Sequence, residues 1–379
     1  MGAFRFLLAT MVVMLHTSLE FGSNFYNIYS PIPMQMVIPS FFMISGFIIM
    51  LSLNKNYTSG NNFLSMSSKY YVNRALRIYP LYFLSILMFY TDVFILNIIK
   101  PSDFAINYSY ILDPTYILSN LVLIFQNTSL LPTVYIIDKT MLINTSAWSL
   151  DIELQWYLYA PIIFYFFYYK FNATYLRIIF YLIIIREGPF HDYRVEQFSY
   201  LNFFILGLLT YDFYLLYESK FQNKLNTKYL LILSTLLIIS YPILSFYING
   251  NISNYNHWLL EIQQAAYVDR RYNFFIKYNA IYYLYWIGLA TLCLSVNFKN
   301  KTDKILGDLS YPIFILHVPF FYMILMQVNK YCNIFFGINH YDSMPFVFIV
   351  SFIFFVIFCY FALWLFQYPL DRLRNKIKS

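Results

Sequence analysis

The sequence is dominated by long apolar stretches, each close to the length that crosses the hydrocarbon of a lipid bilayer. Of its 379 residues, 60% are apolar or aromatic and only 11% are charged, whereas an ordinary soluble domain has about 25% charged residues. A helix needs about 20 mostly apolar residues to span a bilayer. The sequence therefore excludes a water-soluble globule and predicts an all-α integral membrane protein.

Ten apolar stretches are separated by polar or proline-containing joints. The stretch 114–126 is shorter, and we expect it to be interfacial or re-entrant. No linker or internal repeat divides the chain, so we predict a single membrane domain over residues 1–379, with no separate soluble domain. The expected transmembrane helices cover residues 4–19, 34–53, 78–99, 148–169, 174–186, 197–217, 229–248, 280–297, 309–328 and 344–367.

Basic residues are unevenly distributed among the joints. Seventeen of the 25 Lys and Arg residues fall in the two terminal segments and in every second joint, counting Arg5 with the N-terminal segment and Arg177 with the joint beside it. Because translocated loops are poor in Lys and Arg, both termini are predicted to be cytoplasmic. The excess of basic over acidic residues, 25 against 18, therefore reflects membrane topology, and we expect no nucleic-acid partner.

Ionisable side chains inside a membrane helix are functional candidates, because inserting one costs about 2.5 to 3.5 kcal/mol. Arg5 and His16 lie on the first predicted helix with ten residues between them. Eleven steps of 100° return to the same helix face, and the two residues stand about 16 Å apart along the axis. This pattern suits a cationic inner mouth with a base deeper in the membrane. The alternative is that Arg5 anchors the helix and His16 binds a neighbouring carbonyl.

The next two predicted helices contribute small and basic residues. Ser45 and Gly46 lie near the middle of the second helix, where a small pair permits close helix packing. Arg74 and Arg77 lie one turn apart at the cytoplasmic end of the third helix. Their charge fits the positive-inside bias, and their guanidinium groups equally suit a pyrophosphate or a 3′-phosphate.

The fourth predicted helix begins with Trp148 at the outer interface, followed by Asp151 and Glu153 within its first two turns. Glu153 enters from the outer side to about the depth that His16 reaches from the inner side. A carboxylate paired with His16 would fix the imidazole tautomer and raise the basicity of the other ring nitrogen.

The ninth predicted helix carries Tyr311 near its inner end and His317 about two turns deeper. His317 alone fits a structural role as well as a functional one. No two histidines have metal-ligand spacing, so no metal site is expected. The three cysteines are well separated and predict neither a disulfide framework nor a thiolate metal site.

Taken in order, these residues resemble membrane acyltransferase family 3 over nearly the whole chain. That family includes bacterial O-acetyltransferases that modify O-antigen (lipopolysaccharide), capsule and exopolysaccharide. The resemblance implies ten helices in the cell membrane, a cytoplasmic acyl-CoA donor and transfer to a carbohydrate hydroxyl. The matching features are Arg5 with His16, Ser45-Gly46-Phe47, Arg74 to Pro80, Trp148-Ser149-Leu150 followed by Glu153, and Ser310-Tyr311-Pro312 with His317.

The resemblance also assigns expected roles. His16 is the general base and Glu153 its partner. The donor, acetyl-CoA or another acyl-CoA, is a substrate, and no tightly bound cofactor is expected. The residues expected to bind the phosphates of the donor are Arg5, Arg74 and Arg77. Ser45 and His317 are expected to line the passage through which the acyl end of the donor reaches His16. Substrate-binding or structural positions are expected for Trp148, Asp151 and Tyr311. The outer joints 100–147 and 249–279, rich in Asn, Tyr and Ser, are where we expect acceptor selection.

Two alternatives stay open at this stage. Ten spans with ionisable groups inside them also fit a transporter or flippase of a glycan or lipid, although no paired discontinuous helices are apparent. The second alternative is an unrelated membrane-bound acyltransferase that uses His317 as its base, with His16 in a structural role.

Overall fold

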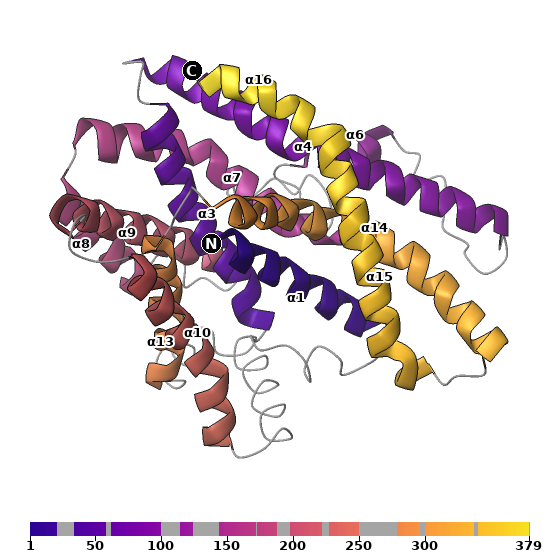
Figure 1. The fold of residues 1–379 in the computed structure, drawn as a ribbon. Coiled ribbons are helices and arrows are strands. Elements are labelled where there is room, and N and C mark those ends of the chain that lie inside the picture. The colour runs from indigo at the N-terminus through magenta and orange to yellow at the C-terminus, as the bar shows by residue number, and fades with distance from the viewer. Residues whose placement is uncertain are drawn as a thin grey trace. The chain divides into compact units, whose positions relative to one another are not determined.

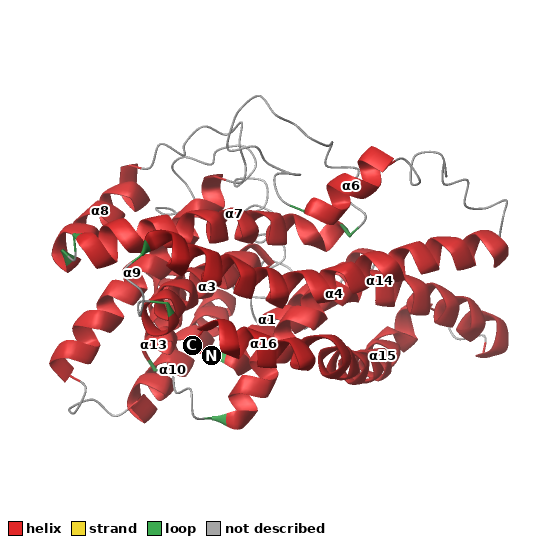
Figure 2. Ribbon diagram, turned by 90° about the horizontal axis from the view of Figure 1, so that it is seen from above, coloured by secondary structure: helices red, strands yellow, loops and turns green. Residues whose placement is uncertain are grey.

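The computed structural model describes residues 1–20, 34–57, 62–99, 114–123, 144–171, 173–187, 198–221, 227–249, 279–295, 300–336 and 340–378. Within these ranges every regular element is a helix (Figure 2). The all-α class predicted from the sequence is therefore confirmed. Each expected apolar stretch coincides with a helix, and α4 (Phe63–Ile99) and α14 (Lys301–Phe336) extend well beyond theirs.

The chain forms two compact units. The first comprises residues 1–11, 24–55 and 162–305, and the second comprises residues 12–23, 56–161 and 306–379. Four helices contribute residues to both units: α1 (Gly2–Glu20), α3 (Met34–Asn56), α7 (Trp148–Ile163) and α14.

The first unit is built mainly from five helices and one π-helical segment. Within it, α10 and α13 lie side by side, and α9 contacts α8 and α13 (Figure 1). The elements are α3 (Met34–Asn56), the π-helical η3 (Phe164–Lys170), α8 (Thr174–Glu187), α9 (Phe198–Phe221), α10 (Thr227–Asn249) and α13 (Asn279–Leu294).

Two glycines bring the backbones of α3 and α9 into direct contact. A Cβ atom built on Gly46 would lie 2.5 Å from the carbonyl oxygen of Phe204, and one built on Gly207 would lie 2.3 Å from that of Met43. Only hydrogen fits at either position, so the sequence expectation that Gly46 permits close helix packing is supported.

We predict that Gly207→Ala destabilises the protein by about 1–3 kcal/mol, because the new methyl group meets backbone atoms that cannot rotate away. Gly288→Ala is the matched control. Its Cβ would come no closer than 3.0 Å to Ile238 and Leu237, whose nearest atoms include the Ile238 backbone nitrogen at 3.1 Å, so a shift of a few tenths of an ångström accommodates it. Thermal unfolding of the detergent-solubilised variants measures the difference, and equal melting temperatures for the two would contradict the prediction.

The second unit contains the remaining helices. Within it, α16 packs against α4, and η5 contacts α4, α15 and α16 (Figure 1). Its elements, besides α4 and parts of α1 and α14, are α6 (Pro114–Val122), η2 (Thr145–Ala147), α7 (Trp148–Ile163), α15 (His340–Ala362), the π-helical η5 (Leu363–Gln367) and α16 (Tyr368–Lys378).

Among the residues that the structure describes, two helical segments are long and apolar enough to cross a membrane, 36–56 and 348–377. Helix α15 and the segment η5 that continues it also expose an apolar stripe whose members recur every three or four residues, so they share one helix face. Their exposed fractions run from 50 to 60%: Ile349, Ile353, Ile357, Tyr360 and Trp364. A continuous exposed apolar face of this kind is typical of a surface covered by lipid or by another protein.

The start of α1 is capped by a side chain from the first turn of α14. The Asp303 carboxylate accepts hydrogen bonds from the backbone N–H groups of Gly2 (3.0 Å) and Ala3 (2.9 Å) and from the amino group of Met1 (3.1 Å). Burial disfavours the charged carboxylate, but these donors outweigh burial and hold the pKa of Asp303 below its usual 3.8. An anion at a helix N-terminus also stabilises the helix dipole.

We predict that Asp303→Ala lowers stability by about 1 kcal/mol, the typical loss for a helix N-cap. Because the pKa of Asp303 is depressed in the folded state, its contribution is complete above pH 3.8 and is lost as the pH falls through the lower folded-state value. The difference in melting temperature between wild type and variant should therefore be constant from pH 5 to 6.5 and shrink below about pH 3.8. A difference that changes between pH 5 and 6.5 would show that another group is involved.

Candidate active site

Two histidines meet in the second unit. Nδ1 of His16, on α1, lies 2.6 Å from Nε2 of His317, on α14. The rings are nearly parallel, with their planes at 22° and their centroids 4.9 Å apart. His317 is fully buried, with 1% of its surface exposed, whereas His16 is partly exposed. The structure therefore places the predicted base in hydrogen-bond contact with a second imidazole.

The hydrogen bonds determine which nitrogen carries each proton. Nδ1 of His317 lies 2.7 Å from the carbonyl oxygen of Phe314, and because a carbonyl only accepts, this nitrogen carries the proton. In an uncharged imidazole the Nε2 of His317 must then be the acceptor, so Nδ1 of His16 donates to it. The remaining nitrogen of His16, Nε2, keeps its lone pair free for a proton.

The turn of α14 around His317 is stabilised by a side chain from another part of the second unit. Pro319 has no N–H group, so the carbonyl of Ile315 lacks its normal partner within α14. The amide of Asn144 fills this gap, since its Nδ2 donates to the Ile315 oxygen at 2.8 Å and to Ser85 Oγ at 3.2 Å. The Asn144 oxygen in turn caps η2 by accepting from the backbone N–H of Ser146 at 3.1 Å. The start of α7 is thereby tied to the turn of α14 that carries the second imidazole.

The acidic residues of α7 have their own partners. Asp151 is fully buried and accepts from Gln155 Nε2 at 2.9 Å, and Glu153 accepts from Tyr157 Oη at 2.6 Å. Glu153 was the expected partner of His16, but the hydrogen bond that the structure shows for His16 is donated to His317. Trp148, at the first position of α7, is partly exposed.

Arg74 is buried between two aromatic rings on the second unit. Its guanidinium carbon lies 5.2 Å from the centroid of Tyr70 and 5.0 Å from that of Tyr157, both cation–π contacts. Tyr157, on α7, also donates a hydrogen bond to Glu153. The contact of Arg74 with the Tyr157 ring therefore connects α4 to α7. Arg77, one turn further along α4, is partly exposed. Tyr311 Oη donates to the carbonyl of Ile78 at 2.8 Å, which brings the predicted inner end of α14 against the same part of α4.

Arg5 and Ser45 belong to the first unit. Arg5 lies in the first turns of α1 and is partly exposed, and Ser45 is buried on α3 beside Gly46. The outer joints expected to select the acceptor lie largely outside the described residues. Within them the structure describes α6 and the segment that begins at Asn144.

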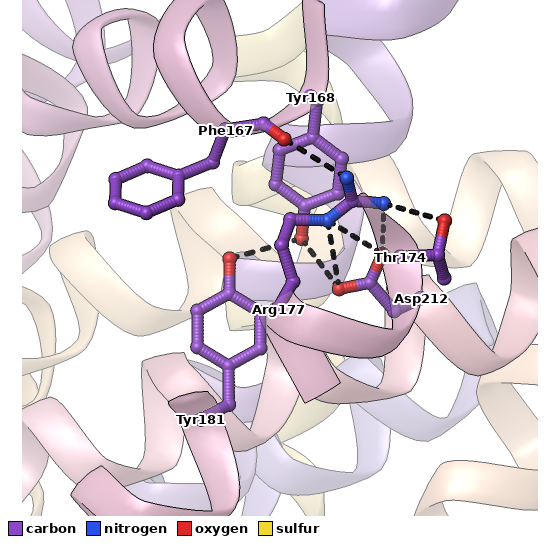
Figure 3. A network of polar contacts seen from close by, with 6 residues as sticks. All are labelled: Phe167, Tyr168, Thr174, Arg177, Tyr181 and Asp212. Carbon is purple, nitrogen blue, oxygen red and sulfur yellow. Dashed lines mark hydrogen bonds and ion pairs between the residues drawn. The ribbon is translucent and has the colours of Figure 1, made fainter. Parts of the chain in front are cut away.

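The first unit contains a buried ion pair that the sequence analysis missed (Figure 3). Arg177 Nη2 lies 2.6 Å from Asp212 Oδ1, and the two side chains are 3% and 0% exposed. Arg177 also donates to the Phe167 carbonyl at 2.8 Å and to Thr174 Oγ1 at 2.9 Å. Tyr168 Oη donates to Asp212 Oδ2 at 3.2 Å, and the Arg177 guanidinium lies 4.1 Å from the Tyr168 ring centroid.

These contacts join three elements. Arg177 comes from α8, Asp212 from α9, and the Phe167 carbonyl from the π-helical segment η3. An extra residue in a π-helical turn shifts backbone groups out of the α-helical pattern, and Arg177 supplies a donor to one of them. The signal available in the sequence was a single acidic residue, Asp212, within an apolar stretch.

Comparison with known proteins identifies the family. The family model described as an acyltransferase domain, acyltransferase family 3, matches residues 1–365 of 379. No curated protein and no solved structure gives a significant match. The matched segment includes both histidines, Arg74, Arg77 and Glu153, so the features that suggested the family are covered. A match over nearly the whole chain shows that this protein belongs to the acyltransferase 3 family and is an acyltransferase.

Proposed function

We propose that this protein is a multi-pass membrane O-acyltransferase that transfers an acyl group, an acetyl group in the first instance, from cytoplasmic acyl-CoA to a hydroxyl of a cell-surface polysaccharide or its lipid-linked precursor. The observation that carries the proposal is the chain from the Phe314 carbonyl through His317 to His16. It leaves one imidazole nitrogen, Nε2 of His16, as an unprotonated base.

The proposed acyl transfer begins at the unprotonated Nε2 of His16. Nε2 of His16 takes the proton from the acceptor hydroxyl while the oxygen attacks the thioester carbonyl. The imidazolium that forms keeps its Nδ1–H bond to Nε2 of His317, which stabilises the positive charge. When the tetrahedral intermediate collapses, the C–S bond breaks, the ester is released, and the coenzyme thiolate recovers the proton from His16.

The other expected residues fit this scheme by their chemistry. Arg74 and Arg77 offer guanidinium groups for phosphates of the donor. From the sequence resemblance alone, we assign a phosphate-binding role to Arg5 and a passage-lining role to Ser45, both in the first unit. Glu153 and Asp151 keep their hydrogen bonds within α7, and with Trp148 and Tyr311 they shape the site from that side.

The membrane location is supported by the exposed apolar faces. Besides α15, helix α10 exposes a second stripe in which apolar residues recur every three or four positions: Ile232, Leu236, Ile239 and Ile243. In water such faces would favour aggregation, whereas lipid covers them at no cost. We propose ten spans with both termini in the cytoplasm of a bacterium, the arrangement that the distribution of basic residues favours.

The test uses membranes that contain the protein and matched membranes from an empty-vector host. Labelled acetyl-CoA is supplied on the cytoplasmic side, and base-labile label is measured in the surface polysaccharide. Label that depends on the protein, with equimolar release of free coenzyme thiol, is the expected result. A protein that binds no acyl-CoA and forms no ester, yet moves a glycan across the membrane, would be a transporter.

A further inference from the structure

The C-terminal helix α16 lies against the part of α4 that carries Arg74 and Arg77. Asn73 Nδ2, on α4, donates to the Arg374 carbonyl on α16 at 3.2 Å. With its amide oriented to satisfy both ends, Gln367 donates to the Arg77 carbonyl at 3.2 Å and accepts from Arg374 Nη1 at 3.0 Å. Arg374 is 9% exposed, so its side chain is directed into the protein. Its neighbour Arg372 is exposed.

Three arginine charges thereby gather on one side of the second unit. The charges of Arg77 and Arg74 both act on Arg374. Two carboxylates oppose them, because Asp371 forms an ion pair with Arg374 and the charge of Glu153 acts on Arg74. Three positive and two negative groups leave one positive charge in excess. Like charges held together away from water are unfavourable unless an anion compensates them.

The same cluster holds buried polar atoms without a hydrogen-bond partner among the described residues. They are Nε of Arg74, Nε of Arg374 and the hydroxyl of Tyr57. Tyr57 is 3% and Arg74 7% exposed, and the charges of all three arginines act on Tyr57. Buried donors are almost always paired in folded proteins. Three such atoms beside an uncompensated positive charge indicate an anionic ligand that accepts hydrogen bonds.

We infer that Arg74, Arg77 and Arg374, with the hydroxyl of Tyr57, bind a phosphate group, and that α16 is therefore part of the binding site. Arginine forks and a hydroxyl donor match the oxygens of a phosphate. Arg374 lies beyond residues 1–365, the segment that the family model matches, so this contribution comes from outside the family domain.

Two ligands carry this chemistry. Coenzyme A has a 3′-phosphate and a diphosphate, and assigning the site to it rests on the proposed function. A phospholipid headgroup at the membrane surface also has a phosphate. The two are distinguished by whether the arginine cluster governs affinity for the coenzyme or retention of lipid.

The test compares Arg374→Gln with Arg372→Gln in the full-length, detergent-solubilised protein. Both variants remove one positive charge from α16, but only the first removes a buried one. Calorimetric titration gives the affinity for coenzyme A, for its form without the 3′-phosphate, and for pantetheine, which has no phosphate. We expect Arg374→Gln to weaken coenzyme A binding by about 10- to 100-fold, the usual effect of losing a charged hydrogen bond. We expect Arg372→Gln to stay within about twofold of wild type, with pantetheine affinity equal in all three proteins.

Each other outcome is informative. If Arg374→Gln leaves coenzyme binding unchanged but loses a phosphatidylglycerol that native mass spectrometry finds on the wild type, the phosphate site stands and its ligand is lipid. If neither changes, the inference is wrong. Arg374→Lys keeps the charge but loses the forked guanidinium donors, so we expect it to give an intermediate affinity. It replaces Arg374→Gln in the test if that variant does not fold. Coenzyme binding that depends on Arg374 without any ester formation would reject the proposed function and leave the phosphate site intact.

Discussion

Replacing His16 with alanine is expected to lower the rate of acyl transfer by about 10²- to 10⁴-fold, the usual contribution of a general base. The affinity for coenzyme A should not change, because in the proposed mechanism the imidazole acts on the acceptor hydroxyl and not on the phosphates. The measurement is a steady-state rate with labelled acyl-CoA, beside a direct titration of the coenzyme.

His317 provides the matched control, since the proposed mechanism makes it a positioning residue that acts through His16. Its Nε2 accepts the Nδ1–H of His16, and the amide oxygen of a glutamine at 317 could accept the same proton. His317→Gln should therefore keep more activity than His317→Leu, with the loss in kcat and little change in KM. Full activity of His16→Ala would defeat the assignment. A larger loss at His317 than at His16 would favour the alternative in which His317 is the base.

Replacing Asp212 with asparagine is expected to lower the free energy of unfolding by about 3–5 kcal/mol. The change leaves the Arg177 guanidinium buried without its compensating charge, in a position that is 3% exposed. Arg177 cannot shed its proton to relieve this, because its guanidinium stays charged at any accessible pH. Unfolding in mixed micelles with increasing dodecyl sulfate measures the loss.

The double variant Arg177→Met with Asp212→Leu separates a missing partner from a missing pair. Removing both charges also removes their desolvation penalty, so apolar replacements of similar size often restore stability. We expect the double variant to be more stable than Asp212→Asn alone. If it is the less stable of the two, the hydrogen bonds of Arg177 to Phe167 and Thr174 matter more than the charge balance.

The helices could be predicted from the sequence because long apolar stretches leave the chain few alternatives. The extra length of α4 and α14 could not, because their first turns are polar and carry no hydrophobic signal. The Gly46 contact was foreseen as one of two explanations, since a small residue in an apolar helix commonly marks close packing. Its partner Gly207 required the structure.

The pairing of His16 with His317 was beyond the sequence. Periodicity shows which face of a helix a residue occupies, but it does not show which helix lies opposite, and these residues are separated by 301 positions. Asp212 was missed because Arg177 was attributed entirely to charge bias in the joint beside it. An acid alone in an apolar stretch should have prompted a search for a basic partner. The role of Asn144 also had a signal in the sequence. Pro319 leaves the carbonyl of Ile315 without its helical partner, and this is the carbonyl that Asn144 binds.

The docking of α16 on α4 has an evolutionary consequence. This terminal helix follows the last residue that the family domain covers, so mutations there leave the imidazole pair untouched. On the proposed phosphate site, selection can adjust the affinity for the donor by altering one short terminal helix, while the chemical step stays constant. Relatives in this family are then expected to diverge in donor preference first at this end of the chain.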